Sequence, residues 1–266
     1  MNTIVPPKPP KSGVKTIRNI IIGIGMLALY IWTFATIEIP WDRIFSQRTI
    51  DNFDRVIPKL FSPDFTFASR VFEYMMETLF IAFTGSFMAA ILAVPFGFFA
   101  ASNINRNPFL NTLGKWILNA DRTFPEILLA LIFVVAIGPG AFAGVLAIAI
   151  HSVGMLGKLY SEVVESIDMN VVEAMEANGA NKIQIFFYGI MPQVIPEFLS
   201  YAIYRFEIDV RASTVLGIIG AGGIGTLLVI SSRNRNWDEV GMILLVIIIF
   251  VSIIDYISTF IRKRIV

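Results

Sequence analysis

The sequence predicts an all-α polytopic membrane protein with about six transmembrane helices. Of its 266 residues 56% are hydrophobic and only 15% are charged, and its mean hydropathy is +0.72. Soluble domains carry about a quarter charged residues, and several apolar stretches here reach the roughly 20 residues that a helix needs to cross a bilayer. The net charge of +1 gives no reason to expect a nucleic-acid partner, and the absence of cysteine excludes disulfides, thiolate metal sites and a cysteine nucleophile.

The first 77 residues predict three segments. Residues 1–16 contain the proline-rich string VPPKPPKSG and are expected to form a flexible cytoplasmic tail. Residues 17–37 form the first transmembrane anchor helix, which is too long for the core of a cleaved signal peptide. Residues 38–77 are polar and mixed in charge, so we expect an extracytoplasmic segment with a surface helix.

Residues 78–266 contain the remaining predicted crossings. These are Thr78–Ala101, Ile117–Ile137, Ala141–Leu156, Ile190–Asp209 and Met242–Ile261. The stretch that starts at Ile117 is the least regular, because charged residues and Pro125 lie in its first half, so five or seven crossings remain possible. Gly138-Pro139-Gly140 is expected to form the turn that follows it.

Basic residues predict the orientation of these crossings. Three lysines precede the first span and Arg18 lies at its start, three Lys/Arg lie between residues 102 and 122, and Arg262-Lys263-Arg264 nearly end the chain. With six crossings all of them fall on one side, which the positive-inside rule makes cytoplasmic. The polar insert at residues 158–189 then also faces the cytoplasm.

This insert predicts two short helices separated by a hinge. Asn170 followed by Glu173 is typical of a helix N-cap with a carboxylate three residues later. Gly179 is expected to end that helix in the left-handed conformation, and Lys182–Tyr188 starts a second helix before Pro192. The insert is either a plain connection or a rigid lever pinned between two spans.

The insert resembles the EAA loop of ABC-importer permeases. Glu173-Ala174-Met175 corresponds to the E-A-A run, and Gly179 and Pro192 keep that family's separation of thirteen positions. Met175, Gly189 and Met191 depart from the family pattern. In this family the loop is a coupling helix that docks into a groove on a separate ATPase subunit. The resemblance covers about the last 190 residues and gives Glu173, Ala174, Gly179 and Pro192 a coupling role.

A second string, FEIDVRASTVLGIIGAGGIG, looks most like the phosphonate-importer permeases, although Asp209 stands where they often have asparagine. Its last twelve residues are similar to permeases of the methionine-importer type, and so imply that fold. The resemblance further implies two copies of an ATPase that binds ATP and magnesium, an extracytoplasmic substrate-binding protein and transport by alternating access. It implies no cofactor on this chain.

The implied cargo is phosphonate or a related phosphorus oxyanion. Six helices enclose a path poorly alone, so we expect two permease copies side by side. Alternatives are an importer of methionine or another small solute, a secondary transporter driven by an ion gradient, and a membrane-embedded enzyme. The sequence contains no P-loop motif and no convergent catalytic set.

The hexapeptide GAGGIG matches the G-x-G-x-x-G pattern of dinucleotide-binding proteins, but a preceding strand and an acidic residue about 20 positions later are missing. In a membrane protein glycines allow close helix contact or a helix break beside a cavity. We therefore expect a gate or packing element formed by Gly220, Gly222, Gly223 and Gly225.

Four charged residues lie just upstream, within YRFEIDVRAS. On a helix they form two i,i+4 pairs, Arg205 with Asp209 and Glu207 with Arg211. They are either an ion-pair clamp or a positive station on the translocation path, where an arginine fork suits phosphoryl oxygens.

Other polar residues in the spans predict structural roles. His151 is the only histidine, so we expect a packed or hydrogen-bonded core residue. Asp121-Arg122 and Glu126 are expected at the cytoplasmic edge of the third span as an interfacial pair. Asp255 is expected to have a local partner.

Overall fold

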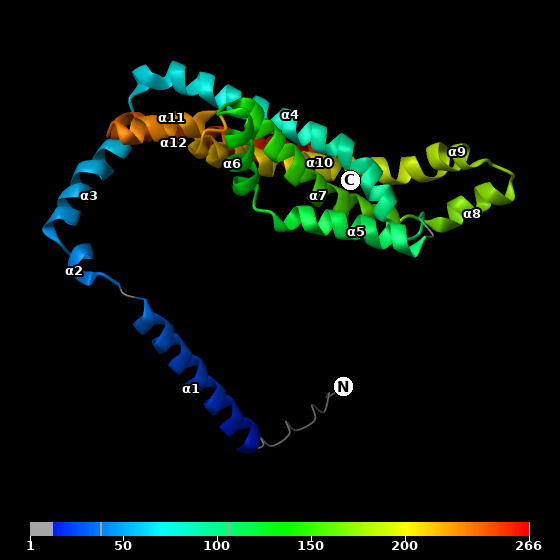
Figure 1. Cartoon of the computed structure of the whole chain (residues 1–266), viewed down its shortest axis with the longest axis horizontal. Coiled ribbons are helices and arrows are strands. Elements are labelled where there is room, and N and C mark those ends of the chain that lie inside the picture. Colours follow the sequence, from blue (N-terminus) through cyan, green and yellow to red (C-terminus); the bar gives the residue numbers. More distant parts are fainter. Residues whose placement is uncertain (1–12, 38, 106, 266) are drawn as a thin grey trace, which may run out of the picture. The chain divides into compact units, whose positions relative to one another are not determined.

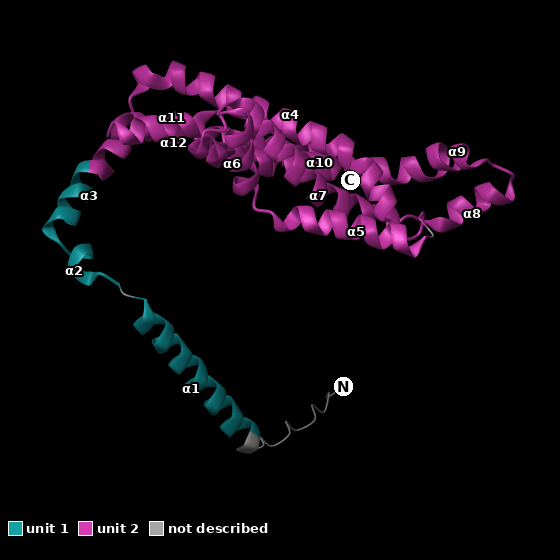
Figure 2. Ribbon diagram, in the orientation of Figure 1, with its two compact units in different colours: residues 1–55 teal, residues 56–266 magenta. Residues whose placement is uncertain are grey.

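The computed structural model describes residues 13–37, 39–105 and 107–265, and every regular element in those ranges is a helix (Figure 1). The chain divides into two compact units, residues 1–55 and residues 56–266 (Figure 2). The all-α prediction is confirmed.

The first unit contains α1, Gly13–Thr36, and α2, Trp41–Ile44, and most of α3, Gln47–Leu60. α1 begins within the segment that we expected to be a flexible tail, so residues 13–16 are helical; residues 1–12 lie outside the described part. The described side chains of α1 are exposed all round, as suits a helix surrounded by lipid. The predicted surface helix corresponds to α3.

The second unit is built on four long helices: α4, Ala68–Ala100; α7, Ala141–Glu165; α10, Met191–Leu216; and α12, Trp237–Ile265. A short 3₁₀ turn, Phe65–Phe67, precedes α4. α4 lies along α7, and α10 packs against both (Figure 1). Glycines permit the close approach of α4 and α7, because a Cβ on Gly85 would lie 2.7 Å from Ile148 Cγ2.

The described helices agree with the predicted crossings, with one correction. Four of them are long and apolar enough to cross a membrane, and the segments Lys182–Ile219 and Ile224–Arg233 (α11), bent by 43°, make a fifth if they are counted as one span. The described residues thus hold four or five such spans, where about six were expected. The continuous helix predicted for 117–137 is wrong. The structure has α5, Pro108–Thr123, and the shorter apolar α6, Glu126–Ile137. Phe124 between them is extended, because a following proline disfavours the helical conformation.

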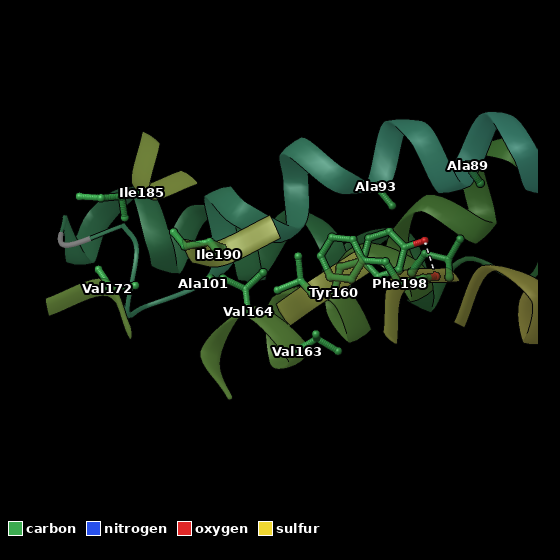
Figure 3. Packing of buried hydrophobic residues seen from close by; sticks show 12 residues of the cluster. Ala89, Ala93, Ala101, Tyr160, Val163, Val164, Val172, Ile185, Ile190 and Phe198 are labelled. Atoms are coloured by element: carbon green, nitrogen blue, oxygen red, sulfur yellow. Dashed lines mark hydrogen bonds between the residues drawn. The ribbon is translucent and has the colours of Figure 1, made fainter. Parts of the chain in front are cut away.

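The core of the cytoplasmic half, by the predicted orientation, centres on two stacked rings. Tyr160 of α7 and Phe198 of α10 have ring centroids 3.9 Å apart, and the Tyr160 hydroxyl donates to the Phe198 carbonyl at 3.2 Å (Figure 3). The same buried cluster extends to Val172, Ile185 and Ile190 in the segment between α7 and α10. That segment is therefore packed onto the bundle through one apolar face.

Candidate functional site

The candidate coupling loop joins the end of α7 to the start of α10. It contains α8, Met169–Ala177, then α9, Lys182–Gln184, and a π-helical turn, Ile185–Ile190. α8 and α9 extend beyond the ends of α4 and α5 at one end of the unit (Figure 1). The loop is shorter than the predicted insert, because α7 continues through Glu165 and takes up its first eight residues, 158–165.

The N-cap of α8 is Asp168, so the predicted cap at Asn170 is wrong. Asp168 Oδ1 accepts from the Asn170 backbone amide at 2.9 Å, while Asn170 itself is already helical. A capping box does occur, but in α9, where the Asn181 and Gln184 side chains each accept from the other's amide. Gly179 has φ +80°, which confirms the predicted left-handed end.

The outer face of α8 is exposed. Val172 is buried against the bundle, whereas Glu173 and Ala174 are exposed. Pro192 lies in the first turn of α10, where its missing N–H is tolerated. The residues of the EAA motif thus present a short, capped helix whose exposed side is available to a partner.

Arg205 and Asp209 form the buried ion pair that their spacing predicts. Arg205 Nη2 lies 2.8 Å from Asp209 Oδ1, and the two residues are 4% and 0% exposed. Asp209 Oδ2 also accepts from Ser86 of α4 at 2.7 Å and from Ser152 of α7 at 2.9 Å. Arg205 Nε donates to the same Ser152 hydroxyl. This arrangement clamps α10 to both neighbouring helices.

The α5–α6 break also points carboxylates into the bundle. Glu126 Oε2 lies 3.8 Å from Arg205 Nη2, and the other Glu126 oxygen is buried without a hydrogen-bond partner. Asp121 accepts from the Gly154 backbone amide of α7 at 2.7 Å. The predicted interfacial pairing of Asp121-Arg122 and Glu126 is therefore wrong. His151 is only half-buried in α7, and its buried Nδ1 has no hydrogen-bond partner, so it is not the packed core residue that we expected. No three His, Cys, Asp or Glu residues group into a metal site in the described ranges.

The second predicted pair, Glu207 with Arg211, lies within α10, and both of its residues also contact α12. Arg211 and Glu207 are in close ionic contact, and Arg262 Nη2 lies 3.4 Å from the other Glu207 oxygen. Asp255 Oδ1 is 3.5 Å from Arg211 Nη2, which supplies the expected local partner. The Arg211 side chain is 50% exposed, in contrast to the enclosed Arg205. Of the two arginines, Arg211 is the accessible one.

The glycine run breaks the helix after α10 and also packs closely, so both expected properties are present. A 3₁₀ turn, Gly217–Ile219, is followed by Gly220, Gly222 and Gly223, all with positive φ. The Gly140 amide donates to the Gly220 carbonyl at 2.9 Å, and Thr78 Oγ1 accepts from the Ile224 amide at 2.8 Å. A Cβ on Gly225 would lie 2.1 Å from the Thr214 carbonyl oxygen.

Substitution of Gly222 by alanine is expected to destabilise the fold through strain and crowding together. Its φ is +82°, and a Cβ would lie 2.8 Å from the Ala141 nitrogen. Gly179→Ala is the control, since Gly179 has φ +80° with nothing within 4 Å. We expect Gly179→Ala to cost about 1–2 kcal/mol by strain, and Gly222→Ala to cost at least about 1 kcal/mol more by overpacking. Denaturation in detergent measures both, and equal losses would contradict the crowding.

A family model matches most of the chain. Residues 93–266 match the binding-protein-dependent transport system inner membrane component. This chain belongs to that family. It is an all-helical, multi-pass inner-membrane permease subunit of an ABC importer, and ATP hydrolysis takes place on a separate subunit of the transporter.

Two relatives support this assignment. The chain is 41% identical over 202 residues to the phosphite transport system permease protein PtxC of Stutzerimonas stutzeri, and the match covers 76% of this chain and 74% of the relative. It is 36% identical over 248 residues to the phosphate-import permease protein PhnE of Mycolicibacterium smegmatis. That match covers 93% of this permease but only 43% of the longer relative.

The fold also has a solved counterpart. The permease superimposes on a chain of the MetNI methionine ABC transporter in an inward-facing conformation with a TM-score of 0.64 and 21% identity, over 74% of this chain and 96% of the other. The predicted methionine-importer-type fold is confirmed.

Proposed function

We propose that this permease imports a phosphorus oxyanion, phosphonate or one closely related to it. The names of its relatives at 36–41% identity carry the proposal, because one is a phosphite permease and the other a phosphate permease. The likeness to the methionine transporter is a likeness of fold, so methionine is the weaker candidate cargo. The family description names a binding-protein-dependent system, and we infer that this binding protein is extracytoplasmic and delivers the anion.

The working assembly contains two permease copies and two copies of the ATPase. The exposed face of α8 around Glu173 and Ala174 docks on the ATPase. Because the loop joins α7 directly to α10, displacement of α8 when ATP binds moves both helices. This motion opens the path alternately to the two sides of the membrane. Among the predicted path residues, Arg211 is half-exposed and offers the anion a positive contact.

The partners of Asp209 argue against a role for this carboxylate in transport driven by an ion gradient, whereas Glu126 keeps one buried oxygen without a hydrogen-bond partner. An ion-coupled carrier needs a carboxylate that is free to bind and release its ion within the membrane. Asp209 instead contacts one arginine and two serine hydroxyls. The exposed, capped α8 favours transport driven by an ATPase, because an ATPase subunit needs a docking surface of this kind on the permease.

The experiment is co-purification followed by uptake into proteoliposomes. The wild-type permease is expressed with its ATPase, and uptake of labelled phosphonate, phosphite, phosphate and methionine is measured with the binding protein present. A variant in which residues 168–180 become a glycine–serine linker of equal length tests the coupling loop. We expect it to lose the ATPase on purification. ATPase retention with full uptake would contradict the coupling role, and uptake of methionine alone would contradict the cargo.

A further inference from the structure

One side chain connects the two ends of the coupling loop. Gln193 lies in the first turn of α10, and its Oε1 accepts from the Asp168 backbone amide at 2.9 Å. Its Nε2 donates to the Gly189 carbonyl at 2.7 Å. The Gln193 amide thus bridges the residue that caps α8 and the π-helical turn that leads into α10.

The junction at Gly189 has weak backbone support of its own. The turn Ile185–Ile190 is π-helical, and such turns occur as short pieces that often mark functional positions. Pro192 follows one residue after this turn and has no N–H to donate to a carbonyl of the preceding turn. The Gln193 side chain adds a hydrogen bond to the Gly189 carbonyl at the point where a force on the loop has to enter α10.

The other end of the connection holds the start of α8. Asp168 accepts from Asn170 through its side chain while its own amide donates to Gln193. The middle of α8 also contacts the π turn, because a Cβ on Gly189 would lie 2.9 Å from Met175 Sδ. An amide side chain can accept at Asp168 and donate at Gly189 at the same time, through two different atoms. A carboxylate in its place would accept from Asp168 but meet the Gly189 carbonyl oxygen unfavourably.

We propose that Gln193 is a positioning residue that transmits displacement of α8 to α10, so that ATP use is coupled to cargo movement. The inference rests on the proposed function, since it requires α8 to dock on the ATPase. Apolar packing of Val172 and Ile190 holds the loop on the bundle, whereas the two hydrogen bonds of Gln193 fix the direction in which the loop moves α10.

The test uses the complete transporter, with ATPase and binding protein, reconstituted in proteoliposomes. Gln193→Leu removes both hydrogen bonds, and Gln193→Glu retains only the acceptor. Gln184→Leu is a matched control, because that glutamine's side chain accepts only within the local capping box, from the Asn181 amide at 2.8 Å. The main readout is the number of ATP molecules hydrolysed per phosphite or phosphonate imported.

We expect both Gln193 variants to raise this ratio about fivefold or more, the effect of losing one net hydrogen bond or more, mainly through lower uptake. ATPase co-purification should match the wild type, and Gln184→Leu should leave the ratio unchanged. The chain contains no cysteine, so Glu176→Cys and Ile195→Cys allow a spin-label distance between α8 and α10 to be measured. Gln193→Leu should broaden that distance distribution.

Two results would overturn the inference while the proposed function stands. One is an unchanged ATP-to-cargo ratio in both Gln193 variants. The other is a parallel fall in uptake, hydrolysis and ATPase recovery, which shows a purely structural role. A wild-type complex whose hydrolysis does not respond to the loaded binding protein would instead contradict the proposed function, and with it the coupling role of Gln193.

Discussion

Arg205→Gln is expected to lower the free energy of unfolding of this permease by about 3–5 kcal/mol, the usual cost of removing one partner from a buried ion pair. The Asp209 carboxylate is 0% exposed and would keep only the hydroxyls of Ser86 and Ser152. Glu126 would at the same time lose the nearest cation among the described residues, which lies 3.8 Å away. Denaturation of the purified permease in detergent measures the loss.

The double variant Arg205→Gln/Asp209→Asn tests whether the uncompensated charge is the cause. It removes both charges of the pair and leaves polar side chains beside the two serines, so the part of the loss that comes from Asp209 should return, while Glu126 stays without its cation. Arg233→Gln is the control, because Arg233 is exposed and has no ion-pair partner in the part of the chain that the structure describes. We expect it to change stability by no more than about 0.5 kcal/mol. A double variant as unstable as the single one would contradict an effect of the Asp209 charge.

Sequence reasoning found the pairing within α10 but not its environment. The i,i+4 pairs follow from helix periodicity, which a single segment determines. Ser86 is 123 positions from Asp209 in the sequence, and Glu126 reaches Arg205 from a separate helix. Contacts of this kind depend on how helices pack, and no pattern within YRFEIDVRAS predicts them.

Helix boundaries show a second limit. Pro95 lies inside α4 without ending it, whereas Pro125 separates α5 from α6. Both prolines lack the same donor. They differ in their surroundings, because α4 around Pro95 is packed against α7, where a Cβ on Gly97 would meet the Tyr160 side chain. Tertiary packing thus decides whether a proline interrupts a span.

The cap of α8 shows the same dependence at shorter range. Asp168 and Asn170 are both good N-cap residues by type, and the sequence pattern with Glu173 favoured Asn170. The structure uses Asp168, whose backbone amide is held by Gln193 across the loop. A long-range hydrogen bond therefore favours one of two locally equivalent caps.

Arg211→Gln is expected to reduce maximal cargo uptake about tenfold or more while leaving the fold intact. A hydrogen bond to a charged group contributes about 1.5–3 kcal/mol, and the Arg211 side chain is 50% exposed, so its fork is accessible to a phosphoryl group. Its removal leaves no isolated buried charge, because Glu207 keeps Arg262 at 3.4 Å. The measurement is uptake into proteoliposomes at saturating loaded binding protein.

Arg211→Gln should lower uptake without lowering stability, whereas Arg205→Gln should lower stability. Arg211→Lys keeps the charge but loses the planar fork, so uptake should be intermediate between wild type and Arg211→Gln. Arg233→Gln again serves as the control, with uptake expected to remain at the wild-type level. If Arg211→Gln transports fully, Arg211 is only an ionic link between α10 and α12. If it loses stability as Arg205→Gln does, the loss of uptake follows from unfolding and the anion contact is contradicted.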